Sequence, residues 1–547
     1  MHPDIGYSSA PILHHMPGVF CAPVILALSI AVSGCGKPPA LVGLPDGAKA
    51  GDFRIEHFTY RTGGGTYDAD RGVITLPENR KRSASRLITL PFVRIRTANR
   101  TPDGPVCFLG GGPGSPNISS DAPLWLDSLL AGHDFIMVGY RGAEGSTVLD
   151  CPEVSEALKG PDDDILSPRA HAALSEAMSS SARSFQNDGI DLTGYTIEEV
   201  AEDLDAVRSA LGCGEVNLLS MSYGTRVALV YSYLHPDRIL RSVMAGANPP
   251  GHFVWEPERI DEQLNQYSRM WEREPGEVNP RKNLAEVMRR VAHAMPDRWL
   301  VFPIDRGKVK VVTFALLFHR RTAAMVFDAY NAADNGDPGG LALMSMAYNF
   351  VVPKMGVWGD FFAKGSTDFD SSRAYAAEMD PPGSILGSPL SLAIWSSVGA
   401  GNAWPVVLLP DTLRRLRPSD TETLVISGSV DFSTPAEAAT NELLPVLARG
   451  RQVILSEMGH CGDMMGLQPE AFAHLVAAFY RTGTADASLF VYSPMDFHVK
   501  WGFPALARIL AGLAFILLAG LAALVWLLTK WYRKRKLRER LQSVAPR

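Results

Sequence analysis

Cysteine is scarce in this sequence and basic residues are not in excess, and each shortage excludes a class of protein. The 547 residues include six cysteines, too few for a disulfide scaffold, and none stands in a Cys-x-x-Cys pair. Lys plus Arg number 52 against 58 for Asp plus Glu, so the basic excess of a nucleic-acid-binding protein is missing. Because 46% of residues are apolar and 20% charged, a disordered chain is excluded too. We expect a folded core with no metal and no nucleic-acid partner.

Positive charge is absent from residues 1–35 and concentrated at the opposite end. Residues 530–547 hold eight Lys or Arg and one Glu, directly after a long run that carries no charge, ILAGLAFILLAGLAALVWLL. At about 1.5 Å per residue, a helix of that length spans about 30 Å, the hydrocarbon thickness of a bilayer. We predict a transmembrane helix over residues 509–529 and a basic cytoplasmic tail over 530–547. By the positive-inside rule the preceding body is extracytoplasmic (periplasmic), attached to the cell membrane.

The first 35 residues have the features of an export signal. A short apolar stretch over residues 18–31 leads into Val-Ser-Gly-Cys35, which resembles a bacterial lipobox, in which the cysteine becomes lipidated. Cys35 is therefore a candidate lipidation site, and a plain cleaved signal peptide is the alternative. A Gly/Pro-rich linker over residues 36–51 follows.

Export to an oxidising compartment permits disulfides among the cysteines of the body. Those cysteines are Cys107, Cys151, Cys213 and Cys461. Four cysteines allow three pairings, which the sequence does not separate. Cys151–Cys213 is the pairing we favour, because both residues look like loop or element-end positions.

The body follows two rhythms. Residues 52–98 alternate polar and apolar side chains as strands do, and from Val106 onward buried strands, Gly-rich turns and helices succeed one another. Such alternation is typical of a parallel sheet covered on both faces. We predict an α/β core in two parts, residues 52–250 and 405–495, interrupted by a mostly helical insertion over 251–404; a separate second domain is the alternative.

A serine stands between a buried strand and a helix in the segment Val-Asn-Leu-Leu-Ser-Met-Ser222-Tyr-Gly-Thr-Arg. A small residue, any residue, Ser, any residue and Gly form the nucleophile-elbow pattern, here with Ser220 in place of the first glycine. The turn exposes the Ser222 hydroxyl, and the helix N-terminus behind it favours developing negative charge. Ser222 is the predicted nucleophile.

A serine hydroxyl needs a base and the base needs an orienting carboxylate, in the chain order Ser, acid, His. His460 follows a late apolar strand and Gly459, and Asp431 follows the strand over residues 423–427. We predict His460 as the base and Asp431 as the acid. Glu457 and Asp463 are nearer in sequence but too close to reach the far ring nitrogen.

A Gly-Gly-Gly-Pro-Gly loop directly after a buried strand supplies unhindered backbone N–H groups. We predict an oxyanion hole formed by Gly111, Gly112 and the N–H of Tyr223. Because neither Gly-Lys-Ser/Thr nor Gly-x-Gly-x-x-Gly follows, we reject a nucleotide site. The predicted chemistry requires no metal and no organic cofactor.

Together with Tyr140-Arg-Gly, Tyr233-Leu-His-Pro-Asp-Arg and the Thr-Pro after Asp431, these motifs resemble a known family. The sequence is similar to α/β-hydrolase peptidases of the proline iminopeptidase and tripeptidyl aminopeptidase type over roughly residues 60–250 and 405–480. The resemblance implies an α/β-hydrolase fold with a helical cap that limits access to short peptides.

The sequence departs from that family in three places. Gly110 stands where a histidine often opens the glycine loop, and Gly139 and Tyr140 replace an acidic residue before the Arg-Gly turn. The insertion is too divergent to recognise. The carboxylate that would bind the amino terminus of a peptide is therefore unassigned, and Glu256, Glu258 and Glu262 are among the candidates.

Four charged residues near these motifs are interpreted as structural. Arg141 and Arg226 would pair with carboxylates under the site, and Asp203 and Asp205 would lie on a polar helix face.

The sequence as a whole predicts a membrane-attached extracytoplasmic serine hydrolase that cleaves short peptides, as an aminopeptidase or exopeptidase, through an acyl-enzyme on Ser222. A carboxylesterase or lipase with the same triad is one alternative, and a non-catalytic binding protein on a hydrolase fold is the other.

Overall fold

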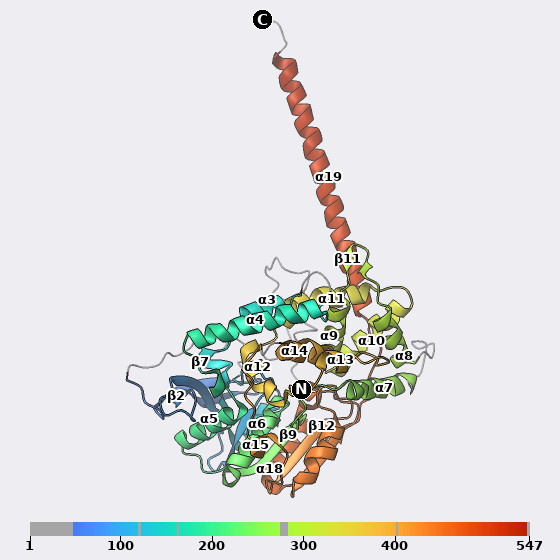
Figure 1. The fold of residues 1–547 in the computed structure, drawn as a ribbon. Coiled ribbons are helices and arrows are strands. Elements are labelled where there is room, and N and C mark those ends of the chain that lie inside the picture. The colour runs from blue at the N-terminus through green and yellow to red at the C-terminus, as the bar shows by residue number, and fades with distance from the viewer. Residues whose placement is uncertain (1–46, 119–121, 161–163, 274–282, 401–402, 544–547) are drawn as a thin grey trace, which may run out of the picture.

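A nine-stranded sheet organises the chain (Figure 1). The computed structural model describes residues 47–118, 122–160, 164–273, 283–400 and 403–543; the predicted signal with Cys35, and most of the linker, lie outside them. In sheet order the strands are β1 (Phe53–Arg61), β2 (Thr66–Pro77), β3 (Leu87–Ile95), β5 (His133–Val138), β4 (Asp103–Leu109), β8 (Val216–Met221), β9 (Ile239–Ala245), β12 (Thr423–Gly428) and β13 (Gly450–Leu455).

The two sequence rhythms correspond to two parts of this sheet. β1, β2 and β3 pair antiparallel, and β3 joins β5 antiparallel. From β5 to β13 every neighbouring pair is parallel. The predicted parallel α/β core is therefore confirmed, and the carboxyl ends of β4, β8, β9, β12 and β13 meet along one edge of the sheet.

Alternate side chains of the parallel strands enter two different cores, as the pleat requires. Leu218 and Val425 belong to a core shared with one set of helices, whereas Leu219 and Leu424 belong to a second core on the opposite face. The first face packs against α3 (Pro152–Ala157), α4 (Pro168–Asn187), α5 (Ile197–Ala210) and α6 (Tyr223–Leu234); the second against α2 (Leu126–Leu130), α17 (Cys461–Gly466) and α18 (Pro469–Thr482).

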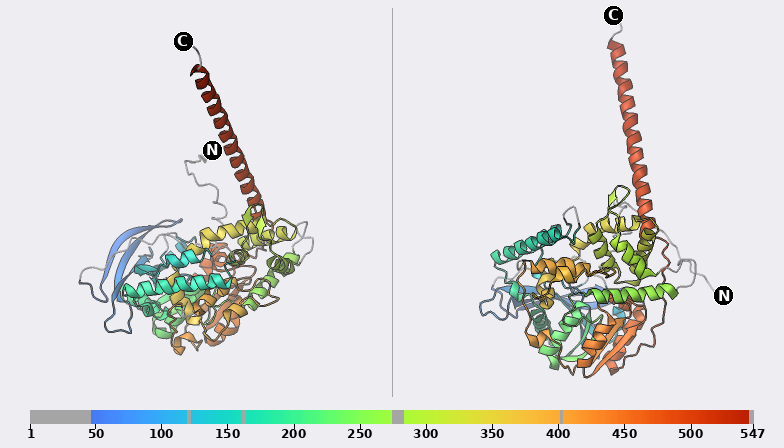
Figure 2. Two further views of the ribbon diagram at one scale, coloured as in Figure 1. Left: turned by 45° about the horizontal axis from the view of Figure 1, so that its top comes forward. Right: turned by 45° about the vertical axis from the view of Figure 1, so that its right-hand side comes forward.

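Between β9 and β12 the described part of the chain is mostly helical. The helices are α7 (Pro257–Arg273), α8 (Leu284–His293), α9 (Arg306–Leu316), α10 (Arg320–Asp334), α11 (Gly339–Val351), α12 (Trp358–Gly365), α13 (Tyr375–Glu378), α14 (Pro389–Gly399) and α15 (Asp411–Arg414). We call residues 251–404 the helical segment. Much of it packs around a core of its own, which also buries Val430 and Phe432 from the loop after β12. The segment therefore lies over the carboxyl edge of the sheet (Figures 1 and 2).

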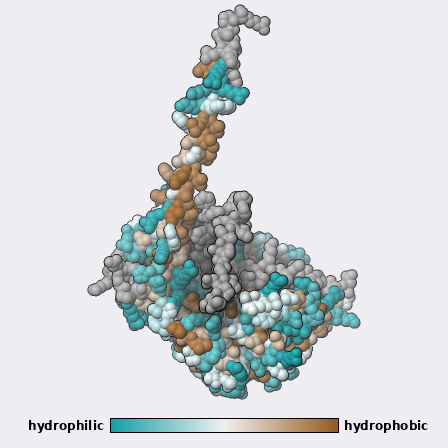
Figure 3. Space-filling view, turned by 180° about the vertical axis from the view of Figure 1, so that it is seen from behind, coloured by the Kyte–Doolittle hydropathy of each residue, from teal (hydrophilic) through white to brown (hydrophobic). Residues whose placement is uncertain are grey.

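The C-terminal helix α19 (Phe503–Ser543) leaves the body and projects away from it (Figure 1). Among the described residues, it alone is long and apolar enough to cross a membrane. Figure 3 shows apolar side chains along its length and polar ones near its far end. Its first turn is different, because Phe503 is buried among α10 and α11.

The expected disulfide between Cys151 and Cys213 is wrong, since both thiols are free. Cys151 is buried beneath the helical segment, where a methyl group on Gly359 would lie 3.1 Å from its Sγ. Cys213 lies past the end of α5, where Arg208 donates to its carbonyl oxygen. The two residues do stand near element ends, but those ends have different neighbours. Cys107 and Cys461 are also free.

Candidate active site

Ser222 sits at the sharp turn from β8 into α6. Its backbone has φ 52° and ψ −123°, a left-handed conformation that is costly for a residue with a Cβ and is often found at functional sites. Its N–H donates to the Ala245 carbonyl at 2.9 Å, which ties the turn to the end of β9. The glycine two residues on is required, because a methyl group at Gly224 would lie 2.1 Å from the Leu109 carbonyl oxygen.

His460 and Asp431 come together from the loops after β13 and β12. The Nδ1 atom of His460 lies 2.8 Å from Asp431 Oδ2 and 3.0 Å from Oδ1, and both side chains are buried. With the proton on Nδ1 donated to this carboxylate, Nε2 is left as a proton acceptor. The spacing in the sequence therefore identified two residues that meet in space.

The Asp431 carboxylate is fixed by its own loop. The backbone N–H groups of Ser433 and Thr434 each donate to Oδ1 at 2.9 Å, and the Thr434 hydroxyl donates to Oδ2 at 2.8 Å. Burial disfavours the charged imidazole, but the neighbouring Asp431 charge outweighs it, and the pKa of His460 is raised well above its usual value.

The two acids nearer to His460 in sequence are engaged elsewhere. Glu457 accepts hydrogen bonds from the Tyr492 hydroxyl at 2.8 Å and the Met495 N–H at 2.7 Å. Asp463 accepts from the N–H groups of Gly459 and Arg320 at 3.0 and 2.9 Å. Asp431 is thus the carboxylate that orients the ring.

Ser222 and His460 both lie close to the carboxyl end of β9. Ser222 is tied to Ala245, and a methyl group on the next residue, Gly246, would lie 3.1 Å from Cε1 of the His460 ring. Among the contacts of the described residues, Ser222 Oγ and the imidazole are not hydrogen-bonded to each other. Such bonds are often long in enzymes without substrate and tighten when it binds.

The glycine loop lies beside Ser222. A methyl group on Gly111 would be 3.5 Å from Ser222 Cβ, and Gly112 has φ 139°, which a residue with a side chain rarely adopts. Within the described ranges, the N–H groups of Gly111 and Tyr223 donate to no protein acceptor. They are therefore free to donate to an oxygen bound next to Ser222.

Two residues that sequence reasoning missed hold this loop in place. Asn117 accepts from the Gly110 N–H at 2.6 Å. The buried carboxylate of Glu144 accepts from the N–H groups of Asn117, Ile118 and Tyr140 at 2.6, 3.2 and 2.9 Å. Burial raises the pKa of Glu144 to about 7 against the lowering effect of these three bonds. The only sequence signal was its place two residues after the Tyr-Arg-Gly turn.

We expect Glu144→Ala to destabilise the fold by about 3 kcal/mol or more, because three buried N–H groups lose their acceptor. Glu144→Gln can keep one acceptor oxygen on the N–H groups of Asn117 and Tyr140, so it should lose less stability and serves as the comparison. Chemical denaturation of the two variants checks this. Equal loss of stability in both would mean that the charge, rather than the acceptor geometry, holds the loop.

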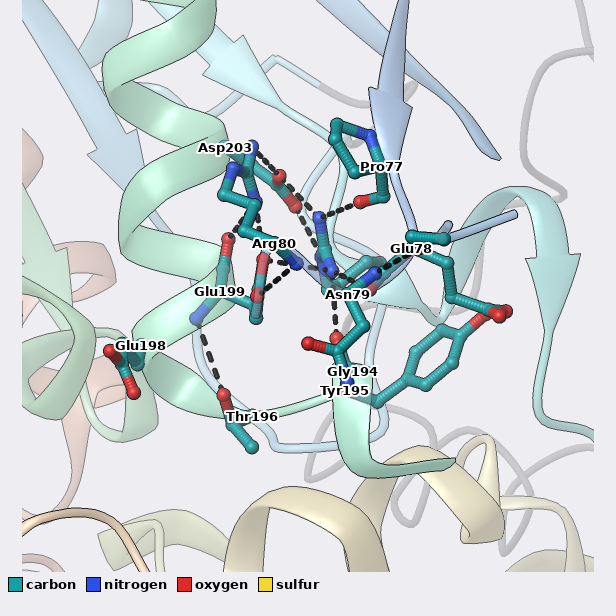
Figure 4. Close-up of polar contacts among 12 residues, drawn as sticks. Pro77, Glu78, Asn79, Arg80, Gly194, Tyr195, Thr196, Glu198, Glu199 and Asp203 are labelled. Carbon is teal, nitrogen blue, oxygen red and sulfur yellow. Dashed lines mark hydrogen bonds and ion pairs between the residues drawn. The ribbon is translucent and has the colours of Figure 1, made fainter. Parts of the chain in front are cut away.

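Arg141 is structural, as expected, but the interpretation of Asp203 was wrong. Asp203 is buried instead of lying on a polar face, and it accepts from Arg141 Nε at 2.6 Å. Arg141 also donates to the carbonyls of Glu78 and Gly194. Asp203 and Glu199 bind Arg80 as well (Figure 4). The buried Arg141 guanidinium stays charged because the Asp203 carboxylate that it binds carries the opposite charge.

The helical segment is tied to the site from two sides. On one side, Asp360 of α12 accepts from the Gly114 N–H at 3.0 Å and forms a fully buried ion pair with Lys364 at 2.5 Å. On the other, Arg226 of α6 forms an ion pair with Asp368 at 3.0 Å, as its structural interpretation predicted. Neither Asp360 nor Lys364 was anticipated from sequence.

The helical segment also covers His460 directly. The backbone N–H of His460 donates to the Phe318 carbonyl at 2.7 Å. The Phe318 and His460 rings pack edge to face with centroids 5.4 Å apart. Trp255 Nε1 donates to the Ser433 carbonyl at 3.1 Å, next to Asp431. Among the carboxylates considered for binding a substrate amino group, Glu256 is already paired with Arg373 at 2.6 Å.

Comparison with known proteins agrees with this geometry. The family model for the alpha/beta hydrolase fold matches residues 104–294, a range that contains Ser222 and the glycine loop. Tripeptidyl aminopeptidase of Streptomyces coelicolor is 28% identical over 207 residues, which cover 35% of this chain and 38% of that protein. Serine protease Hip1 of Mycobacterium tuberculosis is 43% identical over 51 residues, or 9% and 10% of the two chains.

These matches confirm the resemblance to α/β-hydrolase peptidases and the fold that it implied. In both comparisons with curated relatives, the aligned residues make up less than half of this chain and less than half of the relative. A thermophilic esterase from Thermogutta terrifontis is 13% identical in sequence with a TM-score of 0.32, and the alignment covers 78% of this chain and 98% of that one.

Proposed function

We propose that this α/β hydrolase is a serine hydrolase that cleaves short peptides from an end, and that Ser222, His460 and Asp431 carry the reaction. The observation that carries the proposal is the pairing of His460 Nδ1 with Asp431 at 2.8 Å beside the strained Ser222 turn. A base held in one tautomer beside a serine hydroxyl is what acyl transfer needs.

In the proposed reaction the Ser222 oxygen attacks the substrate carbonyl while His460 Nε2 takes the hydroxyl proton. The N–H groups of Gly111, Gly112 and Tyr223 stabilise the oxyanion, and loss of one such donor typically costs about 10²–10³ in rate. His460 then gives its proton to the leaving amine, which departs and leaves the acyl-enzyme. Water, deprotonated by His460, releases the acid and restores Ser222.

Preference for short peptides is supported by two observations. The curated relatives are named an aminopeptidase and a serine protease. The helical segment lies over His460 and Asp431 through Phe318 and Trp255, so it would act as a cap that restricts the length of chain reaching Ser222.

Substrate class is tested by comparing peptidyl p-nitroanilides with p-nitrophenyl esters. We expect turnover of both, because an enzyme that cleaves the anilide will also cleave the ester, which is chemically easier to hydrolyse. For the anilides, kcat/KM should fall as the peptide portion grows beyond a few residues. Initial rates over a series of increasing peptide length measure this. Hydrolysis of esters alone would make the protein a carboxylesterase, and hydrolysis of neither, without labelling by a fluorophosphonate, would favour the non-catalytic alternative.

We further propose that α19 anchors the protein in the cell membrane with the body outside the cytoplasm. Support comes from the apolar surface of α19 and from its basic end, which by the positive-inside rule is cytoplasmic. The N-terminal segment would add a lipid at Cys35.

Attachment predicts that the full chain stays in the membrane pellet after a carbonate wash. A chain that ends after Arg508 and carries Cys35→Ser should be released, since it keeps the docked first turn of α19 but loses the apolar span. Immunoblotting of pellet and supernatant measures the distribution. If Cys35→Ser alone released the protein, α19 would not be an anchor.

A further inference from the structure

Exposed apolar side chains gather at the base of α19. The hairpin of β10 (Arg298–Trp299) and β11 (Phe302–Pro303) projects Leu300 and Val301 at its tip, 64% and 84% exposed. Trp501, two residues before α19, is 64% exposed. Single exposed apolar residues are ordinary on a protein surface, but a cluster of large ones indicates a contact.

The hairpin and α19 are anchored on adjacent residues of one helix. A methyl group on Gly339, the first residue of α11, would lie 2.8 Å from the Trp299 ring. On the next residue, Gly340, it would lie 3.1 Å from Pro504 of α19. The hairpin therefore stands beside the root of α19, as Figure 1 shows.

Two further exposed apolar side chains lie farther along α11. Met346 and Phe350 are one helical turn apart and are both exposed, the latter by 57%. They lie on the same helix as Gly339 and Gly340, against which the hairpin and α19 pack. Leu300, Val301, Trp501, Met346 and Phe350 are named here the membrane-side patch.

The root of α19 holds this patch in a fixed position relative to the helix. Phe503 is fully buried and Ala507 nearly so, between α10 and α11. Arg508 lies 3.6 Å from Asp337, just before the start of α11. A helix joined to the body by a packed turn fixes where the body lies relative to the bilayer, whereas a loose linker would not.

We propose that the membrane-side patch docks on the outer leaflet of the same bilayer that α19 spans, with the tip of the hairpin among the lipid headgroups and upper acyl chains. The proposal rests on the membrane attachment proposed above. The occupant is a lipid surface because the hairpin and the root of the apolar helix α19 contact adjacent residues of α11, Gly339 and Gly340. Exposed Arg298, Lys500 and Arg508 beside it would meet lipid phosphates. Docking would hold the helical segment against the membrane. Phe318, which covers His460, belongs to that segment.

The test uses the full chain, one copy in each lipid nanodisc, with a polarity-sensitive fluorophore on Val301→Cys. Lipids that carry a spin label near the headgroup quench a fluorophore only when it enters the leaflet. We expect a blue-shifted emission and loss of most of the fluorescence when these lipids are present. The unsubstituted chain, treated identically, supplies the background from the native cysteines.

Two labelled controls separate the possible outcomes. Asp237→Cys, exposed at the amino edge of the sheet before β9, should not be quenched. Ile516→Cys, within the apolar run of α19, should be quenched by labels deeper in the acyl chains. Quenching at 516 without quenching at 301 would overturn the docking and leave the anchor intact. Absence of quenching at both would remove the anchor as well, and a blue shift at 301 without quenching would indicate a protein contact and refute the lipid surface.

Discussion

Replacing Ser222 with alanine should lower kcat/KM by about 10⁴-fold or more, because no other group in the site can form the acyl-enzyme. The substitution removes one oxygen atom and keeps the Cβ, so the strained turn at φ 52° is retained. The unfolding free energy should therefore stay close to that of the unchanged chain. Steady-state rates on an activated ester, with denaturant unfolding in parallel, measure the two effects.

Ser222→Gly is the matched control for strain. Glycine adopts positive φ without penalty, so this variant should be equally inactive but more stable, by about 1–3 kcal/mol. A gain in stability together with loss of activity would show that the turn stores strain to present the hydroxyl. Retention of activity in either variant would move the nucleophile elsewhere.

Replacing Asp431 with asparagine should lower kcat by about 10⁴-fold, because the amide no longer fixes the His460 proton on Nδ1. The fold should survive, since an amide oxygen can still accept from the Ser433 and Thr434 N–H groups. The comparison is made by steady-state kinetics over a range of pH.

The pH profile carries the more specific prediction. His460 acts as a base only when neutral, so activity rises as pH rises through its pKa. Since Asp431 raises that pKa well above its usual value, the acidic limb of kcat/KM should lie above that of an ordinary histidine. In Asp431→Asn the burial remains and the raising charge is gone, so the limb should move to lower pH. Thr434→Val keeps the charge and should move it far less, whereas an unmoved limb in Asp431→Asn would mean that another group titrates.

The residues of the predicted triad were accessible from sequence because each carries a local signal. Ser222 needs a small neighbour and a glycine at position 224, because a methyl group added there would strike the Leu109 carbonyl. Asp431 follows the buried strand β12 and His460 follows the edge strand β13, and parallel strands bring their carboxyl ends to one edge. The strands β1 to β3 were also predictable, because the alternation of polar and apolar side chains over residues 52–98 is a local signal.

The residues that brace the site could not be found in this way. Glu144 and Asp360 act on the glycine loop from separate elements, and such contacts depend on the fold as a whole. α9 ends at Leu316 and α10 begins at Arg320, and the break between them contains Phe318, whose carbonyl accepts from the His460 backbone N–H. Asp203 looked like a surface residue because its partners, Arg141 and Arg80, lie more than 60 positions away in the chain.

The most direct test of the central claim is mass-spectrometric mapping of the adduct formed by a fluorophosphonate on the active protein. Such a reagent reacts only with a serine activated by a nearby base. We predict a single adduct on the peptide that contains Ser222. It should form in the unchanged chain and in Glu144→Gln, and it should be lost when His460 is replaced by alanine. An adduct on a different serine, or one that persists without the imidazole of His460, would contradict it.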